Sequence, residues 1–247
     1  MNEIRLALVT GAARGIGRIV SERLAMDGMR IFIADVNEDL AQATADRFID
    51  DGYEAAAISI DVTDPSSVHD GVTHIIENHG HISVLVNNAG IVSNTPWEQT
   101  TFEEWNRVLA VNLTGTQFMT QAVLPDMVKT RYGRIVNIVS LAGRNGGVSV
   151  GPSYAASKAG MIGLTRHYAG KVARMGVTVN AVAPGTTNTE MAAQFTEEQM
   201  TAIRSAIPVG RLGEVNEIAA AVAYFASPYA GFTTGAVLDV NGGMYFG

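Results

Sequence analysis

The stretch Thr10-Gly11-Ala12-Ala13-Arg14-Gly15-Ile16-Gly17 decides the fold of this chain. It follows an apolar run over Leu6–Thr10 and opens a helical pattern over Gly15–Asp27. Glycines at such a turn let the backbone bend tightly and approach a pyrophosphate, and the helix start offers unpaired N–H groups and the positive end of its dipole. A purely structural turn is the alternative, because the spacing Gly-x-x-x-Gly-x-Gly differs from the standard Gly-x-Gly-x-x-Gly. The turn predicts a dinucleotide site if other strand ends support it.

Short β-branched runs alternate with longer helical patterns along the whole chain. Several runs lack polar alternation, which is typical of parallel strands covered on both faces. The pattern predicts the α/β class, with a single doubly wound Rossmann domain over residues 1–247 and a seven-stranded parallel sheet. The expected strands are Leu6–Thr10, Arg30–Ala34, Ala55–Ile60, Val84–Asn87, Arg134–Ser140, Val177–Ala183 and Ala236–Val240. The expected helices are Gly15–Asp27, Asn37–Asp51, Ser66–His79, Phe102–Val128, Ser153–Met175 and Asn216–Ala226.

One long segment, Gly185–Gly213, shows neither pattern. Connections of this length without secondary structure are uncommon in compact domains and usually carry a function. Within the segment, Thr196-Glu197-Glu198 has the form of a helix start. We therefore expect a substrate lid at about residues 186–212, and a passive insertion is the alternative.

The composition excludes several classes of protein. The 247 residues include no cysteine, which rules out a disulfide framework, a cysteine zinc site and a cysteine nucleophile. Lys+Arg 17 against Asp+Glu 24 leaves a net charge of −7, which disfavours non-specific binding to nucleic acid. The longest nearly unbroken apolar run, Ile218–Ala226, is shorter than the ~18 residues of a membrane span, and the start of the chain lacks a signal-peptide pattern. We expect a soluble, cytoplasmic protein with no nucleic-acid or membrane partner.

Polar or glycine residues follow the next three expected strands. Asp35 ends the second strand, where a carboxylate can accept hydrogen bonds from the adenosine ribose and would repel a 2′-phosphate. Asp35 therefore favours NAD(H) over NADP(H), whereas the basic Arg14 in the turn favours the opposite choice. The structural alternative for Asp35 is the N-cap of the next helix. Asp61-Val62 ends the third strand and Asn87-Asn88-Ala89-Gly90 ends the fourth, at the edge where open sheets bind ligands.

A second set of residues carries the chemistry. Tyr154 and Lys158 lie one turn apart on one face of a predicted helix. A phenol has an ordinary pKa of about 10, and we expect the Lys158 ammonium to lower the pKa of Tyr154. Ser140 ends the fifth expected strand and can hydrogen-bond a substrate oxygen, while Asn112 is an amide in a long apolar helix. A chance pair, a strand-end cap and a core amide are the structural alternatives, but the order of these residues along an α/β chain favours a catalytic set.

Together these residues resemble a single-domain short-chain dehydrogenase/reductase over essentially the whole chain, from Thr10–Gly17 to Asn241-Gly242-Gly243. The resemblance implies hydride transfer between a nicotinamide and a carbonyl or secondary alcohol. It makes Tyr154 the general acid/base and Lys158 the group that lowers its pKa and binds the nicotinamide ribose. Ser140 would position the substrate carbonyl, and Asn112 would support a water relay to Lys158. The implied cofactor contacts are Gly11, Arg14, Gly15, Ile16, Gly17, Asp35, Asp61, Val62, Asn88, Ala89, Gly90, Tyr154, Lys158, Pro184, Gly185, Thr187 and Thr189, and no metal is expected.

Within the family, the stretches Asn180–Gly185, Pro208–Glu214 and Thr234–Tyr245 resemble 3-oxoacyl-[acyl-carrier-protein] reductases. This implies a keto or hydroxy substrate such as a 3-oxoacyl thioester, with an acyl carrier protein as a candidate partner. Two departures keep an alternative open. Asp35 favours NAD(H), whereas such reductases usually use NADPH, and the stretch Ser140–Tyr154 is one residue longer than expected. The alternative is an NAD-dependent dehydrogenase of a sugar, polyol or other small secondary alcohol.

Partners follow from the same resemblance. Docking of an acidic carrier needs a basic surface, and an ordinary solvated helix surface is the alternative reading of the basic residues. The resemblance also implies a homotetramer. A different class, a catalytically silent dinucleotide-binding regulator, would be marked by loss of Tyr154, Lys158 or Ser140, and all three are present. The candidate docking residues are Arg131, Arg134, Lys171 and Arg174.

Overall fold

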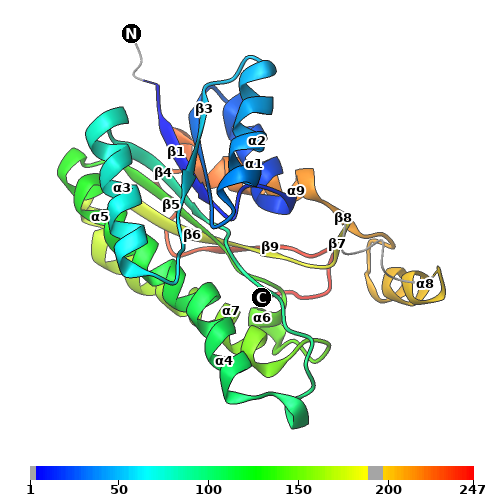
Figure 1. Cartoon of the computed structure of the whole chain (residues 1–247). Coiled ribbons are helices and arrows are strands. Elements are labelled where there is room, and N and C mark those ends of the chain that lie inside the picture. Colours follow the sequence, from blue (N-terminus) through cyan, green and yellow to red (C-terminus); the bar gives the residue numbers. More distant parts are fainter. Residues whose placement is uncertain (1–3, 189–196) are drawn as a thin grey trace.

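Seven parallel strands form the central sheet in the computed structural model of the protein (Figure 1), which describes residues 4–188 and 197–247. They lie in the order β3-β2-β1-β4-β5-β6-β9, and every neighbouring pair is parallel. The order reverses between β1 and β4, which places a topological switch point at the carboxyl ends of these strands. This confirms the predicted α/β class and the seven-stranded sheet. The bounds are β1 Leu6–Thr10, β2 Arg30–Asp35, β3 Ala55–Ser59, β4 Ile82–Asn87, β5 Gly133–Ile138, β6 Val177–Pro184 and β9 Val237–Val240.

Two apolar cores hold helices against opposite faces of the sheet (Figure 1). In β1, Ala7 and Val9 belong to the first core, whereas Leu6 and Leu8 belong to the second, so both faces of the strand are buried. This explains why the strand shows no polar alternation. The helices of the first core are α1 (Gly15–Met26), α2 (Glu38–Asp50) and α9 (Val215–Ala226). Those of the second are α3 (Pro65–His79), α5 (Gly115–Thr130) and α7 (Pro152–Val172).

The helix predicted over Phe102–Val128 is interrupted. α4 spans Phe102–Leu109, a π-helical turn labelled η2 spans Ala110–Thr114, and α5 begins at Gly115. A π turn adds one residue to a helix and leaves the apolar spacing almost intact, so the sequence pattern could not reveal it. At Gly115 a Cβ atom would lie 2.7 Å from the Val62 side chain, and α5 therefore starts in close contact with the segment after β3. The π turn carries Asn112, and such turns occur often at functional sites.

Short elements connect the layers and frame the segment predicted as a lid. β7 pairs with β8, which holds the two ends of that segment together, and α8 stands to one side of the sheet in Figure 1. The single-domain and lid assignments stay predictions. None of the helices formed by residues 4–188 and 197–247 is long and apolar enough to span a membrane. The short elements are η1 (Trp97–Gln99), α6 (Ala142–Asn145), η3 (Ala173–Met175), β7 (Thr187–Asn188), α8 (Glu197–Ala206), β8 (Gly213–Glu214) and η5 (Pro228–Ala230).

Candidate active site

The glycine-rich turn has the backbone that its sequence predicted. Gly11 and Gly15 adopt φ values of 60° and 59°, in the left-handed region that favours glycine. A Cβ atom at Gly17 would collide with the Gly11 carbonyl oxygen and would lie 2.5 Å from Asn88 Nδ2. The three glycines are therefore required by the shape of the turn and by its close approach to the end of β4.

The first turn of α1 is open to a ligand. Arg14, at the N-cap position, makes no side-chain hydrogen bond to the helix start, and the first turn contains no acidic residue. A Cβ atom at Gly15 would meet no atom within 4 Å, so the space in front of the turn is free. Unpaired N–H groups and the helix dipole favour an anion here. The turn thus fits the pyrophosphate of a dinucleotide, with Ile16 partly buried behind it against the first core.

Thr10 and Asn88 lock the turn to β4. Asn88 Nδ2 donates to the Thr10 and Gly11 carbonyl oxygens at 2.9 Å each. Thr10 Oγ1 in turn accepts from the backbone N–H groups of Asn88 and Ala89 at 3.1 and 3.0 Å. The sequence placed Asn88 and Ala89 at this edge but missed the part played by Thr10, whose only signal was its position as the last residue of β1.

Asp35 lies beside the glycine-rich turn. Its carboxylate accepts from Ala13 N at 3.2 Å and from Asn37 N at 3.1 Å. The N-cap of α2 is Asn37, whose side chain accepts from Leu40 N at 3.0 Å, so the alternative that Asp35 caps this helix is wrong. Asp35 therefore presents a negative charge next to the turn, while Arg14 is exposed to solvent.

Asp61 and Val62 lie just after β3, which ends at Ser59. Asp61 Oδ1 accepts from the Thr63 backbone N–H at 2.8 Å and from the Thr63 hydroxyl at 2.7 Å. Val62 is buried against Gly115. The two residues are thus held in place by the chain's own contacts, Asp61 partly exposed and Val62 joining the start of α5.

Tyr154, Ser140 and Lys158 converge at the carboxyl end of β5. α7 carries Tyr154 and Lys158 one turn apart, with Lys158 Nζ 5.8 Å from the centre of the Tyr154 ring. The Ser140 side chain hydrogen-bonds to the Tyr154 side chain. Ser140 Oγ also accepts from Ala142 N at 3.1 Å, which leaves its hydroxyl proton available for another oxygen. The three side chains can together polarise a carbonyl group and exchange a proton with it.

The pKa values of this group differ from the sequence expectation. Lys158 is only 4% exposed, its Nζ donates to the Ile138 carbonyl oxygen at 2.8 Å, and burial lowers its pKa to about 8. Burial also raises the pKa of Tyr154, and the Ser140 hydrogen bond opposes this rise only in part. The sequence predicted that Lys158 lowers the pKa of Tyr154, whereas in the folded protein this pKa is raised. The phenol stays protonated because removing its hydroxyl from water disfavours the phenolate.

Asn112 joins the loop after β4 to the catalytic helix. It is fully buried, and its Oδ1 accepts from Ile91 N at 2.8 Å while its Nδ2 donates to the Ile91 carbonyl and to Ser157 Oγ, both at 3.0 Å. Ser157 Oγ donates to the Tyr154 carbonyl oxygen at 2.8 Å. Sequence reasoning missed Ser157, although its place three residues after Tyr154 puts it on the same helix face. A Cβ atom at Gly90 would lie 3.2 Å from Asn112 Oδ1 and 3.4 Å from Lys158 Nζ, so the two polar groups border one glycine.

The end of β6 lies at the same edge of the sheet. The Pro184 carbonyl accepts from Leu141 N, and Gly185 N donates to the Val240 carbonyl, each at 2.9 Å. Thr187 Oγ1 donates to the Gly185 carbonyl at 3.0 Å. Pro184, Gly185 and Thr187 thus lie beside the turn that follows Ser140, whereas Thr189 lies outside the described residues. Over residues 4–188 and 197–247, no three His, Cys, Asp or Glu side chains gather in a way that could hold a metal ion.

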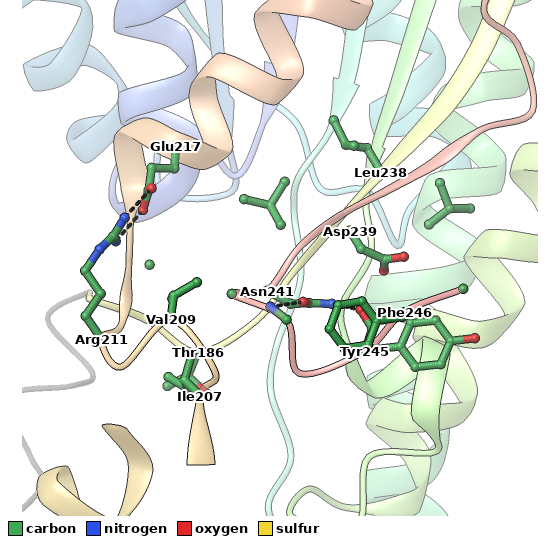
Figure 2. A pocket seen from close by; sticks show the side chains of 16 residues that line it. Thr186, Ile207, Val209, Arg211, Glu217, Leu238, Asp239, Asn241, Tyr245 and Phe246 are labelled. Atoms are coloured by element: carbon green, nitrogen blue, oxygen red, sulfur yellow. Dashed lines mark hydrogen bonds and ion pairs between the residues drawn. The ribbon is translucent and has the colours of Figure 1, made fainter. Parts of the chain in front are cut away.

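A pocket of about 530 Å³ opens next to this edge, between β9 and the segment after α8 (Figure 2). On one side Arg211 and Glu217 form two hydrogen bonds of 2.8 Å, and on the other lie Asp239 and Tyr245. None of the four predicted catalytic residues lines the pocket. Thr186, which does line it, lies between the predicted cofactor contacts Gly185 and Thr187. The pocket is therefore separate from the catalytic group around Tyr154.

Proteins with similar sequences match the chain along nearly its whole length. A family model described as Enoyl-(Acyl carrier protein) reductase matches residues 11–245. The chain is 43% identical over 243 residues to the 3-oxoacyl-[acyl-carrier-protein] reductase FabG of Vibrio cholerae, with 98% of both chains covered. It is 42% identical over 245 residues to the protein of the same name from Escherichia coli, again with 98% of both chains covered.

Two solved structures have the same fold. One, described as a candidate gluconate dehydrogenase from Agrobacterium tumefaciens, has a TM-score of 0.93 and 32% identity, covering 97% of this chain and 95% of that one. The other, named gox2181, has a TM-score of 0.94 and 33% identity, covering 98% of this chain and 96% of that one. The similarity thus extends over the sheet, both helix layers and the carboxyl-end edge.

Proposed function

The chain belongs to the short-chain dehydrogenase/reductase family, and from this premise we propose that it reduces a 3-oxoacyl thioester with a nicotinamide cofactor. Members of the family are oxidoreductases that act on carbonyl and alcohol groups with NAD(P)(H). The observation that supports the proposal most is the convergence of Tyr154, Ser140 and Lys158 at the sheet edge that also carries the glycine-rich turn. The substrate class is proposed from the names of the two relatives.

In the proposed reduction, a nicotinamide cofactor bound beside Tyr154 and Lys158 would supply the hydride that the carbonyl carbon gains. Ser140 donates a hydrogen bond to the carbonyl oxygen and holds it beside Tyr154. Tyr154 gives its hydroxyl proton to that oxygen, so that the product is a secondary alcohol and the tyrosine becomes a phenolate. Because burial raises the pKa of Tyr154, the proton is retained until the oxygen becomes basic enough to take it.

Lys158 and Asn112 are proposed to restore the proton. With a pKa of about 8, Lys158 carries a positive charge at neutral pH and stabilises the phenolate that forms next to it. It would also hold the nicotinamide ribose. Asn112 and Lys158 both border Gly90, and a water molecule held there would connect Lys158 to solvent.

We propose NAD(H) as the preferred cofactor because of Asp35. The carboxylate is fixed by Ala13 N and Asn37 N beside the turn, where it can accept from ribose hydroxyls and repel a 2′-phosphate. Arg14 is exposed and makes no helix-capping contact, so it could move toward a phosphate but is not held there. The remaining predicted cofactor contacts keep their proposed roles, with Thr189 outside the described residues.

Docking of an acyl carrier protein is part of the proposal, with one correction to the basic surface. Arg134 is only 5% exposed, and its guanidinium donates to the Gly133 and Ser227 carbonyl oxygens at 2.9 and 3.2 Å, so it cannot meet a partner. Arg131, Lys171 and Arg174 are exposed. Arg131 Nη2 donates to the Arg174 carbonyl at 3.3 Å, which brings these two residues together on one surface. A cytoplasmic homotetramer, implied by the family resemblance, is likewise proposed.

A second candidate function is oxidation of a sugar, polyol or other small secondary alcohol with NAD. One solved structure of the same fold is described as a candidate gluconate dehydrogenase. Asp35 and the additional residue between Ser140 and Tyr154 also favour this alternative over a typical carrier-protein reductase. The same catalytic group would serve, with Tyr154 taking a proton instead of giving one.

A steady-state screen distinguishes the two functions. Acetoacetyl thioesters would be tested for reduction, and gluconate and polyols for oxidation, each with both nicotinamide cofactors. We expect the highest kcat/KM with a 3-oxoacyl thioester and NADH. A higher value with a polyol or sugar acid would select the second function. A purified protein that binds NADH but converts none of these compounds would contradict both and favour a silent binding protein.

A further inference from the structure

A buried ion pair lies outside the catalytic group described above. Arg144 Nη2 is 3.1 Å from Asp239 Oδ2, and the two side chains are only 10% and 15% exposed. Arg144 belongs to α6, directly after Ser140, whereas Asp239 belongs to β9 at the edge of the sheet. Burying two charges is costly even when they pair, so an ion pair at this location is unlike a surface salt bridge.

Tyr245 holds Arg144 from a second side. The guanidinium carbon of Arg144 lies 4.8 Å from the centre of the Tyr245 ring, within the range of a cation–π contact. Asn241 Nδ2 donates to the Tyr245 carbonyl oxygen at 3.4 Å, which links the C-terminal tail to the residue that follows β9 (Figure 2). The strand β9 and the C-terminal tail therefore both contact the Arg144 side chain of α6.

The ion pair is not arranged for the greatest stability. Arg144 Nε and Asp239 Oδ1 are both buried without a hydrogen-bond partner. A guanidinium and a carboxylate that are free to adjust usually form two parallel bonds. The single bond indicates that α6 and β9 each have other contacts, which keep the two side chains of the pair from reaching this ideal geometry.

Those other contacts lead to the catalytic group. Ala142 N donates to Ser140 Oγ, so α6 sets the orientation of the hydroxyl that bonds to Tyr154. A Cβ atom at Gly143 would lie 2.7 Å from the Lys158 carbonyl carbon, so the backbone of α6 touches α7 at Lys158. A small displacement of α6 would change the surroundings of Ser140 and Lys158 at once.

We propose that Arg144 and Asp239 are positioning residues, whose ion pair holds α6 from the C-terminal side so that Ser140 keeps its bond to Tyr154. The inference rests on the proposed function and extends it to residues that touch neither substrate nor cofactor. It assigns to β9 and the C-terminal tail a role in setting the rate, although they lie far along the chain from Tyr154.

Two variants test the proposal. Asp239→Asn removes the carboxylate charge and so weakens the interaction of residue 239 with Arg144. The double variant Arg144→Met with Asp239→Leu removes both charges at similar volume, and such replacements are often neutral or stabilising. We expect both proteins to fold. The thermal midpoint of the double variant should be near or above that of the wild type. We expect kcat to fall by about ten- to a hundredfold in the double variant, since small misplacements at a reacting centre have effects of this size.

The pH profile provides the readout that a purely structural pair would not move. The Ser140 hydrogen bond lowers the pKa of Tyr154, so its loss should shift the tyrosine limb of the kcat/KM profile for alcohol oxidation to higher pH. Asp239→Asn should give a shift in the same direction and a smaller loss of kcat. Binding of NADH should stay within about twofold of the wild type, because the glycine-rich turn is untouched.

Glu54→Gln is the matched control, because it breaks the exposed Arg30–Glu54 pair of 2.7 Å at the opposite edge of the sheet. It should leave kcat and the pH profile unchanged. A folded double variant with wild-type kcat and pH profile would overturn the inference, and a double variant that fails to fold would assign the pair to stability alone. A wild-type protein that converts neither substrate class would instead overturn the proposed function.

Discussion

The cofactor end of the candidate active site, at the glycine-rich turn, and its substrate end, at Ser140 and α6, differ in what gives them their shape. At the cofactor end, Gly11, Gly15 and Gly17 shape one short turn, which Asp35 and Asn88 support from the ends of β2 and β4. At the substrate end, the turn after Ser140 is held by β6 and β9, which come much later in the sequence. The first end is defined by backbone shape, whereas the second depends on side chains brought together by the fold.

This difference determines what each end tolerates. A backbone cradle loses its shape when a single Cβ atom is added, so substitutions there should act on cofactor binding and stability together. Side-chain contacts can be exchanged one at a time, so substitutions at the substrate end should alter rate or specificity with a smaller effect on folding. The following predictions test this contrast, from the largest expected effect to the smallest.

Gly17→Ala should have the largest effect. The added methyl group would collide with the Gly11 carbonyl oxygen and would lie 2.9 Å from Ala12 Cα, neither of which can move freely. We expect the free energy of unfolding to fall by about 1–3 kcal/mol. We also expect NADH affinity to fall by about tenfold or more, which corresponds to ~1.4 kcal/mol. Urea unfolding and NADH fluorescence titration measure the two quantities.

Gly163→Ala is the control for this substitution. Gly163 lies on the exposed face of α7 with no atom within 4 Å of an added Cβ, so alanine should stabilise the helix by about 0.5–1 kcal/mol and leave NADH binding unchanged. Wild-type NADH affinity in the Gly17 variant would show that the turn is not the cofactor cradle.

Asp35→Ala should change the choice of cofactor. Removing the carboxylate ends its repulsion of a 2′-phosphate and frees the Ala13 N–H that it now accepts from. We expect the ratio of kcat/KM for NADPH over NADH to rise by about tenfold, equivalent to ~1.4 kcal/mol. Asp51→Ala, at the far end of α2, should leave the ratio unchanged. A wild-type protein that already prefers NADPH would refute the charge argument.

Cofactor affinity should depend on pH through Lys158. Its pKa, lowered by burial from 10.5 to about 8, means that the ammonium loses its proton as the pH rises through about 8. NADH affinity should therefore fall above this pH, and Lys158→Met should bind NADH more weakly with no such step. The same shift has the opposite effect on folding: between about 8 and 10.5 the unfolded chain binds the additional proton, so the Lys158 contribution to stability rises with pH. A flat NADH-binding profile in the wild type would contradict the assignment.

Substitution of the proposed carrier surface should have the smallest effect. Arg131→Ala with Arg174→Ala removes two exposed charges without touching the catalytic group. We expect KM for a carrier-linked substrate to rise several-fold, by about 1 kcal/mol in binding, and KM for a small free thioester to stay unchanged. Arg47→Ala, on the exposed surface of α2, is the control. Equal effects on both substrates would refute carrier docking on this surface.

The sequence was informative where a local pattern carries the structure. The glycine-rich turn, the apolar strands and the Tyr154–Lys158 spacing each lie within a few residues, and the predicted sheet follows from them. The π turn at Asn112 was not predictable, since it leaves the helical pattern intact. The pKa direction of Tyr154 was predicted wrongly, because burial depends on the packed fold and here outweighs the Ser140 hydrogen bond that lowers the pKa.

Long-range contacts account for the remaining differences. Arg134 looked like surface charge in the sequence, yet its guanidinium reaches the Ser227 carbonyl across the sheet and is buried there. The ion pair of Arg144 with Asp239 joins residues that lie far apart along the chain, so no local sequence pattern could indicate it. Such contacts join distant parts of the chain, which explains why the shape of the glycine-rich turn was easier to predict than the surroundings of Ser140.

Single-turnover hydride transfer in Tyr154→Phe tests the central proposal most directly. NADH would be bound first, a 3-oxoacyl thioester added, and the loss of NADH absorbance followed beside the wild type. Phenylalanine keeps the ring but removes the proton donor, so the rate should fall by about a thousandfold or more while NADH affinity stays near that of the wild type. A variant that transfers hydride at the wild-type rate would show that Tyr154 does not supply the proton.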